Sequence, residues 1–179
     1  MKKAMINYIK NPKNDELYTP TYAIEPLIKY LVDLENNLQR NLIIWECTDY
    51  GESNITSILE YYDFKVISTH ISNFDFLNDK VNFDFDVIVT KPPYSLKDEF
   101  LQKCYEYNKP FALLLPITSL EGVKRHNMFK NKGIELLIFD KRINFMTGKK
   151  SCWFNTSWFC YHLLPQQIIF EKLKKQKDK

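Results

Sequence analysis

The sequence predicts an α/β fold built on a single, doubly wound and mostly parallel sheet. Short apolar runs typical of buried parallel strands alternate with stretches of helical periodicity. Several of these runs end at polar turns or prolines, which stop a strand. The chain has 179 residues without an internal repeat or a linker-like change in composition, so we expect one domain over residues 1–179.

The individual elements follow from local patterns. Helices are expected over residues 21–36, 53–62, 96–107 and 119–129, where apolar residues recur at helical spacing, with Ser53 as an N-cap. Strands are expected over residues 42–45, 65–68, 86–90, 111–115, 135–139 and 156–163. Right-handed crossovers between parallel strands wind such a sheet in both directions. Ligands then bind beyond the carboxyl ends of the strands, near the topological switch point.

Composition excludes several classes of protein. The four glycines, at positions 51, 122, 133 and 148, are too far apart for a P-loop or an intact GxGxxG turn. No apolar run reaches the 18 residues of a membrane span, and the N-terminus lacks the apolar core of a signal peptide. We therefore expect a cytoplasmic protein whose four cysteines are thiols. Cys152, Cys160 and His162 fit no zinc spacing, and strand alternation explains them better, so no metal site is expected.

The charge of the chain is nearly balanced. Its 25 basic and 22 acidic residues give a net charge of +3, which is too small to indicate a nucleic-acid binder by itself. Much of the excess lies at the chain ends, notably in the basic tail over residues 172–179. A lysine run of this kind is typical of a solvated helix end, with a phosphate-seeking arm as the alternative.

Chemistry is expected at three strand ends. At the first, Glu46 and the start of the helix capped by Ser53 present a carboxylate and backbone N–H groups, which suits a small-molecule cradle or an ordinary loop. At the second, Pro92 and Pro93 predict a rigid protruding turn that places the flat face of Tyr94 at the mouth, as a platform for a planar base or as a simple strand stop.

The third strand end carries cations and an aromatic residue. Lys141, Arg142 and an exposed-looking Phe145 suit phosphate binding and base stacking, or form a solvated loop. Residues 149–155 interleave basic and aromatic side chains, which is typical of nucleic-acid contact or of a core segment.

Taken together, these motifs carry a family resemblance over residues 15–171. The chain resembles S-adenosylmethionine-dependent methyltransferases that act on amino groups, in particular the small adenine-N6 methyltransferase-like proteins common in phage genomes. Tyr18-Thr19-Pro20 is similar to the segment over the methionine end of the cofactor, Trp45-Glu46 to the start of the cofactor loop, and residues 73–77 to the motif whose acid, here Asp75, receives the adenine amino group. Residues 90–94 are similar to the (Asn/Asp/Ser)-Pro-Pro-(Tyr/Phe) catalytic motif, and residues 111–116 and 139–145 match the segments that follow.

The resemblance implies a Rossmann-like methyltransferase fold with S-adenosylmethionine as cofactor and nucleic acid as substrate. In such a site the amide or acid and the next backbone carbonyl hold the hydrogens of an exocyclic amine and direct its lone pair to the methyl donor, while an aromatic ring stacks the base. The catalytic positions would be Lys91, Pro92, Pro93 and Tyr94, and Tyr94, Phe145, Lys141 and Arg142 would contact the substrate. The cofactor positions would be Tyr18, Thr19, Pro20, Glu46, Gly51, His70 and Asp75.

Three departures from the family pattern concern activity. Lys91 occupies the position of the amide or acid and has no acceptor, the glycine-rich loop keeps only Gly51 between Tyr50 and Glu52, and His70 replaces the acid that holds the ribose. They predict weakened cofactor binding and lost or altered methyl transfer. The alternatives are an enzyme of reduced activity and an inactive binding protein, for example a phage antagonist of a host defence system that acts in the host cytoplasm on nucleic acid or on a host protein complex. About 34 residues follow Phe145, too few for a target-recognition domain, so sequence-specific DNA binding by this chain alone is not expected.

Overall fold

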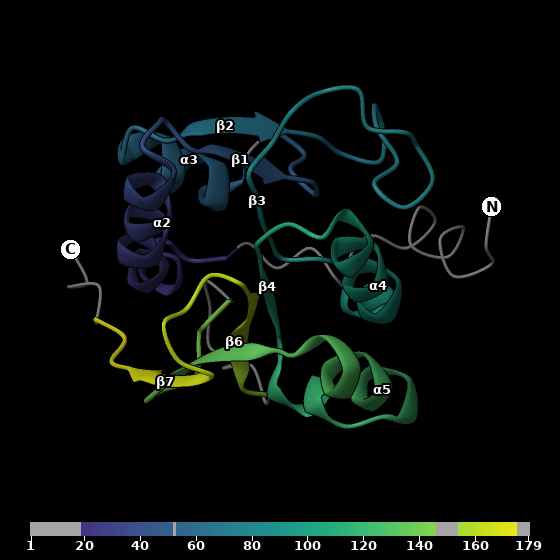
Figure 1. Ribbon diagram of the computed structural model, residues 1–179. Coiled ribbons are helices and arrows are strands. Elements are labelled where there is room, and N and C mark those ends of the chain that lie inside the picture. Colours follow the sequence, from purple (N-terminus) through teal and green to yellow (C-terminus); the bar gives the residue numbers. More distant parts are fainter. Residues whose placement is uncertain (1–18, 52, 146–153, 175–179) are drawn as a thin grey trace.

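The computed structural model describes residues 19–51, 53–145 and 154–174. Their strands form one seven-stranded sheet in the order β2-β1-β3-β4-β6-β5-β7, with β2 and β7 at its edges (Figure 1). The strands are β1 (Ile43–Glu46), β2 (Lys65–Ser68), β3 (Val87–Thr90), β4 (Phe111–Pro116), β5 (Glu135–Phe139), β6 (Thr156–Tyr161) and β7 (Ile168–Glu171). The helices are η2 (Thr21–Ala23), α2 (Glu25–Leu38), α3 (Asn54–Tyr61), η3 (Tyr94–Leu96), α4 (Lys97–Tyr107), η4 (Ile117–Leu120) and α5 (Val123–Lys132).

The pairing of the strands confirms the predicted doubly wound, mostly parallel sheet. β1 pairs in parallel with β2 on one side and with β3 on the other, and β3 pairs in parallel with β4. β6 lies between β4 and β5 and is antiparallel to both, while β5 and β7 are parallel. The chain therefore winds outward in one direction from β1 to β2 and in the other from β3 onward. This places the topological switch point between β1 and β3.

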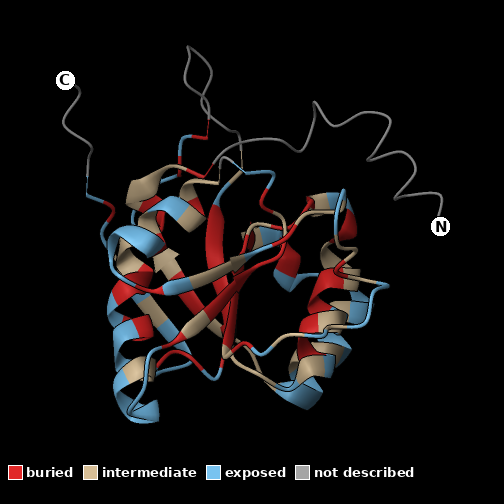
Figure 2. Ribbon diagram, turned by 90° about the horizontal axis from the view of Figure 1, so that it is seen from above, coloured by how far each residue is buried: buried red, intermediate tan, exposed pale blue. Residues whose placement is uncertain are grey.

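Alternating side chains of the strands build one core on each face of the sheet. Ile44 of β1 packs with α2 and α3 on one face, whereas Trp45 packs with α4 on the other. Figure 2 shows the buried strands lying between these two layers of partly exposed helices. Burial on both faces explains why the strands read as continuous apolar runs.

Trp45 fixes the long segment between β2 and β3. Residues 69–86 contain no helix or strand, yet aromatic side chains from this segment surround the indole ring at centroid distances of 4.9–5.7 Å; these are Phe74, Phe76, Phe83 and Phe85. The indole Nε1 also donates a hydrogen bond to Thr69 Oγ1 at 2.8 Å. This packing holds residues 69–77 against the carboxyl ends of β1 and β3.

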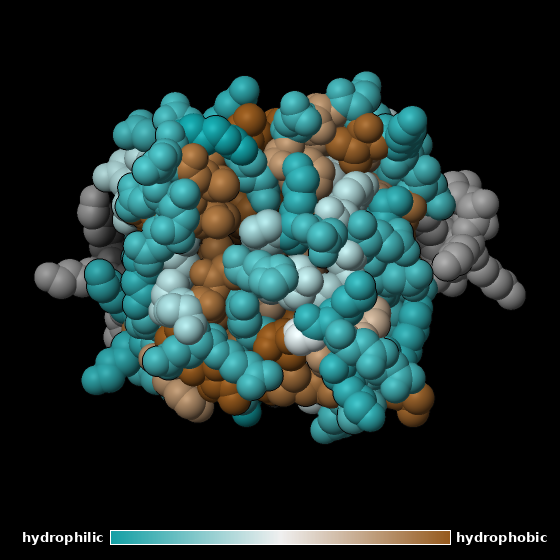
Figure 3. All heavy atoms as spheres, viewed as in Figure 1, coloured by the Kyte–Doolittle hydropathy of each residue, from teal (hydrophilic) through white to brown (hydrophobic). Residues whose placement is uncertain are grey.

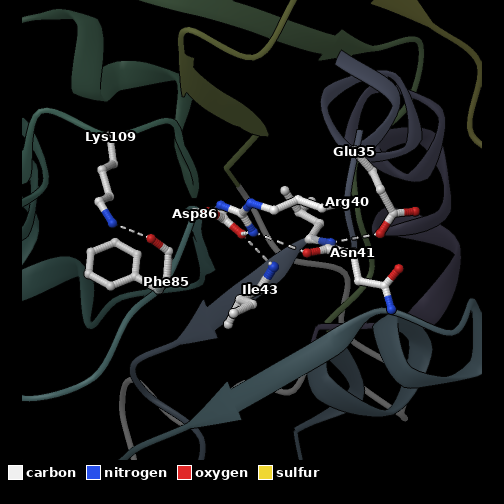
Figure 4. Close-up of polar contacts among 8 residues, drawn as sticks. Glu35, Arg40, Asn41, Ile43, Phe85, Asp86 and Lys109 are labelled. Carbon is white, nitrogen blue, oxygen red and sulfur yellow. Dashed lines mark hydrogen bonds and ion pairs between the residues drawn. The ribbon is translucent and has the colours of Figure 1, made fainter. Parts of the chain in front are cut away.

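A charged cluster fixes the opposite, amino-terminal ends of the same two strands. Asp86, just before β3, accepts a hydrogen bond from the backbone N–H of Ile43 at 2.8 Å and is paired with the Arg40 guanidinium (Figure 4). Burial alone would raise the pKa of Asp86, but the hydrogen bonds from Arg40 and Ile43 outweigh it and lower that pKa. The register between β1 and β3, on which the switch point depends, is thus held from both ends.

The differences from the predicted elements lie after residue 116. The helix predicted over residues 119–129 is two elements, η4 and α5, because Gly122 with a φ of +116° separates them. β6 ends at Tyr161 rather than residue 163, since His162 adopts a positive φ. β7 was not predicted. The basic tail does not begin as a helix: residues 172–174 are irregular, and Leu173 is buried with its N–H donated to Asp140.

The described surface is polar with scattered apolar groups. Figure 3 shows a mostly hydrophilic face on which hydrophobic residues appear in separate areas. Within the described ranges, no helix combines the length and the apolar character that crossing a bilayer requires. Cys47, Cys104 and Cys160 are buried free thiols, as expected, while Cys152 lies outside the described residues.

Candidate functional site

The switch point is closed by a hydrogen-bond network centred on Glu46. This residue ends β1, and its Oε1 accepts hydrogen bonds from the backbone N–H and the hydroxyl of Thr48 at 2.9 and 3.0 Å and from the hydroxyl of Thr90 at the end of β3. Ser53 Oγ donates to the other carboxylate oxygen at 3.4 Å. The two strand ends are therefore joined through one side chain.

The expectation that Glu46 exposes its carboxylate is wrong. The residue is only 1% exposed, because the hydroxyls of Thr48 and Thr90 cover it. Burial raises the pKa of Glu46 to about 7, although the hydrogen bonds from Thr90 and Thr48 act in the opposite direction. Glu46 thus lies beneath the surface of the site and holds Thr48 and Thr90 in place.

The loop that follows β1 is organised by Asp49, which the sequence analysis did not single out. Its carboxylate accepts hydrogen bonds from the N–H groups of Gly51 and Ser53 at 2.7 and 3.0 Å and from the Thr56 hydroxyl at 2.6 Å. Burial alone would raise its pKa, but these bonds prevail and lower the pKa. Gly51 has a φ of +103°, which favours glycine, and a Cβ there would meet no atom within 4 Å.

Tyr50 does not fill the loop. Its side chain is 75% exposed, and its ring contacts the His70 ring edge-on at a centroid distance of 4.6 Å. Glu52, the other departure next to Gly51, lies outside the described residues. Tyr50 stands where the family pattern has a small residue. It therefore places an exposed aromatic ring at the edge of the loop, beside the end of β2.

A pocket that is partly open to solvent lies at this edge of the sheet, between the ends of β1 and β3 and the segment after β2. Its lining is mostly apolar with a few polar groups, which is typical of small-molecule sites. The lining residues are Cys47, Thr48, His70, Ile71, Phe74, Asp75, Phe76, Leu77, Pro93, Leu96 and Phe100. Burial raises the pKa of the Cys47 thiol, so this wall of the pocket stays uncharged.

Asp75 holds the wall of the pocket in shape. Its carboxylate accepts hydrogen bonds from the N–H of Leu77 at 3.0 Å and from Nδ2 of Asn78 at 2.7 Å. Its own N–H donates to the carboxylate of Asp79 at 2.8 Å. The half-buried Asp75 is the pocket's carboxylate among the described lining residues.

The proline turn after β3 is not a protruding lip. Pro92 and Pro93 are buried, and Pro93 lines the pocket. The carbonyl of Lys91 accepts a hydrogen bond from Thr48 Oγ1 at 3.3 Å, which brings the turn against the loop after β1. The turn is buried because it fills the junction between the two strand ends.

Tyr94 is not an open stacking platform. Its ring is half-buried, with the ammonium of Lys91 over it at 5.0 Å from the centroid and Phe154 packed edge-on at 5.8 Å. The lysine that replaces the motif amide or acid therefore also occupies a face of the aromatic ring expected to hold a base.

The segment after β5 differs from its prediction at one residue. Lys141 and Arg142 are exposed, and Arg142 Nε donates to Asn155 Oδ1 at 2.7 Å. Phe145, expected to be exposed, is only 6% exposed and packs near Phe154 at 6.5 Å, in the core on the α2 side. It shapes the base of this loop instead of presenting a face to a ligand.

The Tyr-Thr-Pro segment reaches the same edge. Thr19 is buried, and its carbonyl accepts a hydrogen bond from Nδ2 of Asn54, the first residue of α3, at 2.9 Å. Pro20 is half-buried next to it, and Tyr18 lies outside the described residues. Over residues 19–51, 53–145 and 154–174, no group of three or more His, Cys, Asp or Glu side chains is arranged to hold a metal ion.

Comparison with known proteins identifies the fold. No protein-family model and no curated protein matches the chain. Among solved structures, it is similar to a modification subunit of a putative type I restriction enzyme from Vibrio vulnificus YJ016, with a TM-score of 0.52 and 10% sequence identity. The fold is methyltransferase-like. The match covers 99% of this chain and 51% of that subunit, so the chain spans about half the length of its structural neighbour.

The methyltransferase-like fold brings most of the predicted cofactor residues to one edge of the sheet. His70, Asp75 and Pro93 line the pocket, and Glu46 lies beneath it. Thr19 is held at the same edge by the hydrogen bond that its carbonyl accepts from Asn54, and Gly51 is held there by the hydrogen bond that its N–H donates to Asp49. Phe74 lies within residues 73–77, which the sequence analysis matched to a cofactor motif. The sequence analysis missed Ile71, for which the neighbouring His70 is a signal, and the hydroxyl pair of Thr48 and Thr90, for which no local signal exists.

Proposed function

We propose that the protein is an adenine-N6 methyltransferase-like protein whose partner is nucleic acid, and that it binds S-adenosylmethionine through its adenosyl group. The adenosyl group would lie in the pocket between the ends of β1 and β3, which we call the nucleoside pocket. The observation that supports this most strongly is the position of the pocket, at the switch point of a methyltransferase-like fold, with Asp75 in its wall. Its apolar lining suits a purine ring, and a carboxylate suits the amino group of adenine. The cofactor supplies the transferable methyl group.

The residues of this chain have separate tasks in the proposed site. Phe74, Leu77 and Leu96 would exclude water from the purine, and Asp75 would accept a hydrogen bond from its amino group. Thr48 and the carbonyl of Lys91 hold the pocket against the proline turn. Lys141 and Arg142, exposed on the same edge, would contact the phosphates of the nucleic acid.

Lys91 favours a second candidate function, that of a binding protein without methyl transfer. An ammonium group donates hydrogen bonds but accepts none, and it repels both the sulfonium and the cationic transition state. Its position over the Tyr94 ring further removes a stacking surface. In this candidate the pocket and its surroundings capture a nucleotide, a nucleic acid or a host protein complex.

Calorimetric titration with S-adenosylmethionine tests the proposed binding. We expect saturable binding to the wild type and an affinity at least about tenfold lower for Leu77→Trp, which fills the pocket from its half-buried wall. Leu120→Trp, a matched change at an exposed site on η4, should leave the affinity unchanged. No heat of binding at millimolar cofactor, or equal affinities for wild type and Leu77→Trp, would refute this proposal.

A further inference from the structure

The two edge strands of the sheet differ in the side chains that they expose. At the β2 edge the exposed residues are Lys65 and Ser68, and a lysine on an edge strand opposes pairing with a further strand. At the other edge, β7 exposes Ile168 and Phe170, whose side chains are 48% and 77% exposed. Figure 1 shows β7 at the end of the sheet away from β2, and within the described ranges no other strand pairs with its outer side. The β7 edge is therefore apolar and open.

The backbone of β7 also offers hydrogen-bonding groups at this edge. The carbonyls of Gln167 and Glu171 accept backbone hydrogen bonds from the β5 side at 2.8 and 3.0 Å, so the odd-numbered residues of β7 face β5. Both backbone groups of a residue point to the same side of a strand, and successive residues alternate. The N–H and C=O groups of Ile168 and Phe170 therefore point away from β5, toward the open edge.

Ile168 and Phe170 project from the same face of the sheet. Ile169, between them, packs against the core on the α2 side. Their register partners in β5 are Leu136 and Ile138, which pack in the core on the other face, beneath α4 and α5. The high exposure of Ile168 and Phe170 shows that the helices of this face do not reach the edge strand.

We propose that β7 pairs with β7 of a second copy of this chain, in antiparallel orientation and with Ile169 opposite Ile169. Each Ile168 then lies opposite Phe170 of the other copy, and the two residues of each pair exchange both of their backbone hydrogen bonds. Their side chains form cross-strand apolar pairs on one face. A register centred on Ile168 would place Phe170 opposite Gln166, and one centred on Phe170 would place Ile168 opposite Lys172.

The charges that flank β7 favour the antiparallel orientation. The uncharged residues 165–167 precede the strand, and the exposed Lys172 and Lys174 follow it. Antiparallel pairing sets the lysines of each copy beside the uncharged segment of the other, whereas parallel pairing brings the two basic segments together. The exposed parts of Ile168 and Phe170 in two copies amount to roughly several hundred Å², below the about 1,200–2,000 Å² of a standard interface. The dimer is therefore weak and depends on protein concentration.

The pairing fixes how the two proposed sites would lie. β7 runs in the same direction as β1, β3 and β4, because it is parallel to β5, and β6 is antiparallel to both β5 and β4. Antiparallel contact of two β7 strands joins the two seven-stranded sheets with their carboxyl ends pointing in opposite directions. The two nucleoside pockets then lie on opposite edges of the joined sheet, and pairing leaves each of them open.

Sedimentation equilibrium of the full chain at increasing protein concentration tests the pairing. We expect the average mass to rise from that of one chain toward that of two. Phe170→Lys, which replaces the apolar contact with a charge, should raise the dissociation constant of the dimer at least about tenfold. Ile168→Pro should raise it as well, because proline lacks an N–H that points to the open edge and that the ladder with β5 does not use. Tyr61→Lys, at an equally exposed aromatic residue on α3, should leave it unchanged.

Amide hydrogen exchange measured by NMR locates the contact. The N–H groups of Ile168 and Phe170 should become protected as the concentration rises, while that of Val66, which points away from β1 at the other edge, should exchange at a constant rate. A chain that stays monomeric at every concentration overturns the inference and leaves the β7 edge to a strand of another protein. A dimer that either Phe170→Lys or Ile168→Pro leaves intact also overturns it, because that dimer forms without strand pairing at β7. These experiments contain no cofactor, so their failure leaves the proposed adenosyl site untouched.

Discussion

Replacing Lys91 with asparagine should raise the rate of methyl transfer to adenine-containing nucleic acid by about 10–100-fold, the range expected from one or two well-placed hydrogen bonds in a transition state. Asparagine supplies the acceptor that the amine of adenine requires, and it removes a charge that opposes the sulfonium. It also clears the face of Tyr94 that Lys91 now covers. Transfer of labelled methyl groups from S-adenosylmethionine to DNA and RNA measures this rate.

The control for this experiment is Lys130→Asn, the same change at an exposed site on α5, which should leave the rate as in the wild type. The backbone contact between Lys91 and Thr48 does not depend on the side chain, so the variant should keep its fold. If Lys91→Asn binds the cofactor but transfers no more methyl groups than the wild type, the defect does not lie at Lys91, and the inactive binding protein becomes the better description.

Replacing Glu46 with glutamine should stabilise the protein at alkaline pH by about 3 kcal/mol, the free energy that corresponds to a pKa of about 7 in the fold against an ordinary value of 4.5. The folded state binds the proton of Glu46 more tightly than the unfolded state does. The contribution of Glu46 to the stability of the wild type is therefore greatest below about pH 4.5. It falls as the pH rises to about 7 and stays constant above that value. Glutamine keeps the accepting oxygen for Thr48 and Thr90 and cannot ionise.

Urea unfolding at pH 5 and pH 8 measures this difference. The gain for Glu46→Gln should be small at pH 5 and large at pH 8, whereas Glu60→Gln, at an exposed site on α3, should change neither value. A loss of stability that is the same at both pH values would show that the glutamate is ionised in the folded protein and stabilised by its four hydrogen bonds.

Local sequence patterns predicted the sheet well because its central strands, such as β3 and β4, are buried on both faces. The apolar runs before residue 116 could be recognised as strands from the local sequence alone. The doubly wound order follows from the alternation of helices and strands. β7 was missed because its short run, next to a lysine-rich tail, has Phe170 exposed at 77% and resembles a loop.

The errors at the site share a long-range cause. Glu46 was expected to be exposed, but Thr90, 44 residues further along the chain, covers it. Phe145 looked exposed after two cations, yet the segment folds back into the core around α2. Pro92 and Pro93 are buried because the turn packs against Thr48. Each error depends on a contact between segments that are far apart in the sequence, which no local pattern contains.

Methyl NMR of the protein titrated with S-adenosylhomocysteine, the demethylated cofactor, tests most directly whether the nucleoside pocket holds an adenosyl group. If the pocket holds the adenosyl group, the methyl signals of Ile71, Leu77 and Leu96, which line the pocket, should shift on titration. Those of Ile28 and Leu31, in the core beneath α2, should stay in place. Saturable binding that leaves the three pocket residues unchanged, or no shift at any concentration, would contradict it.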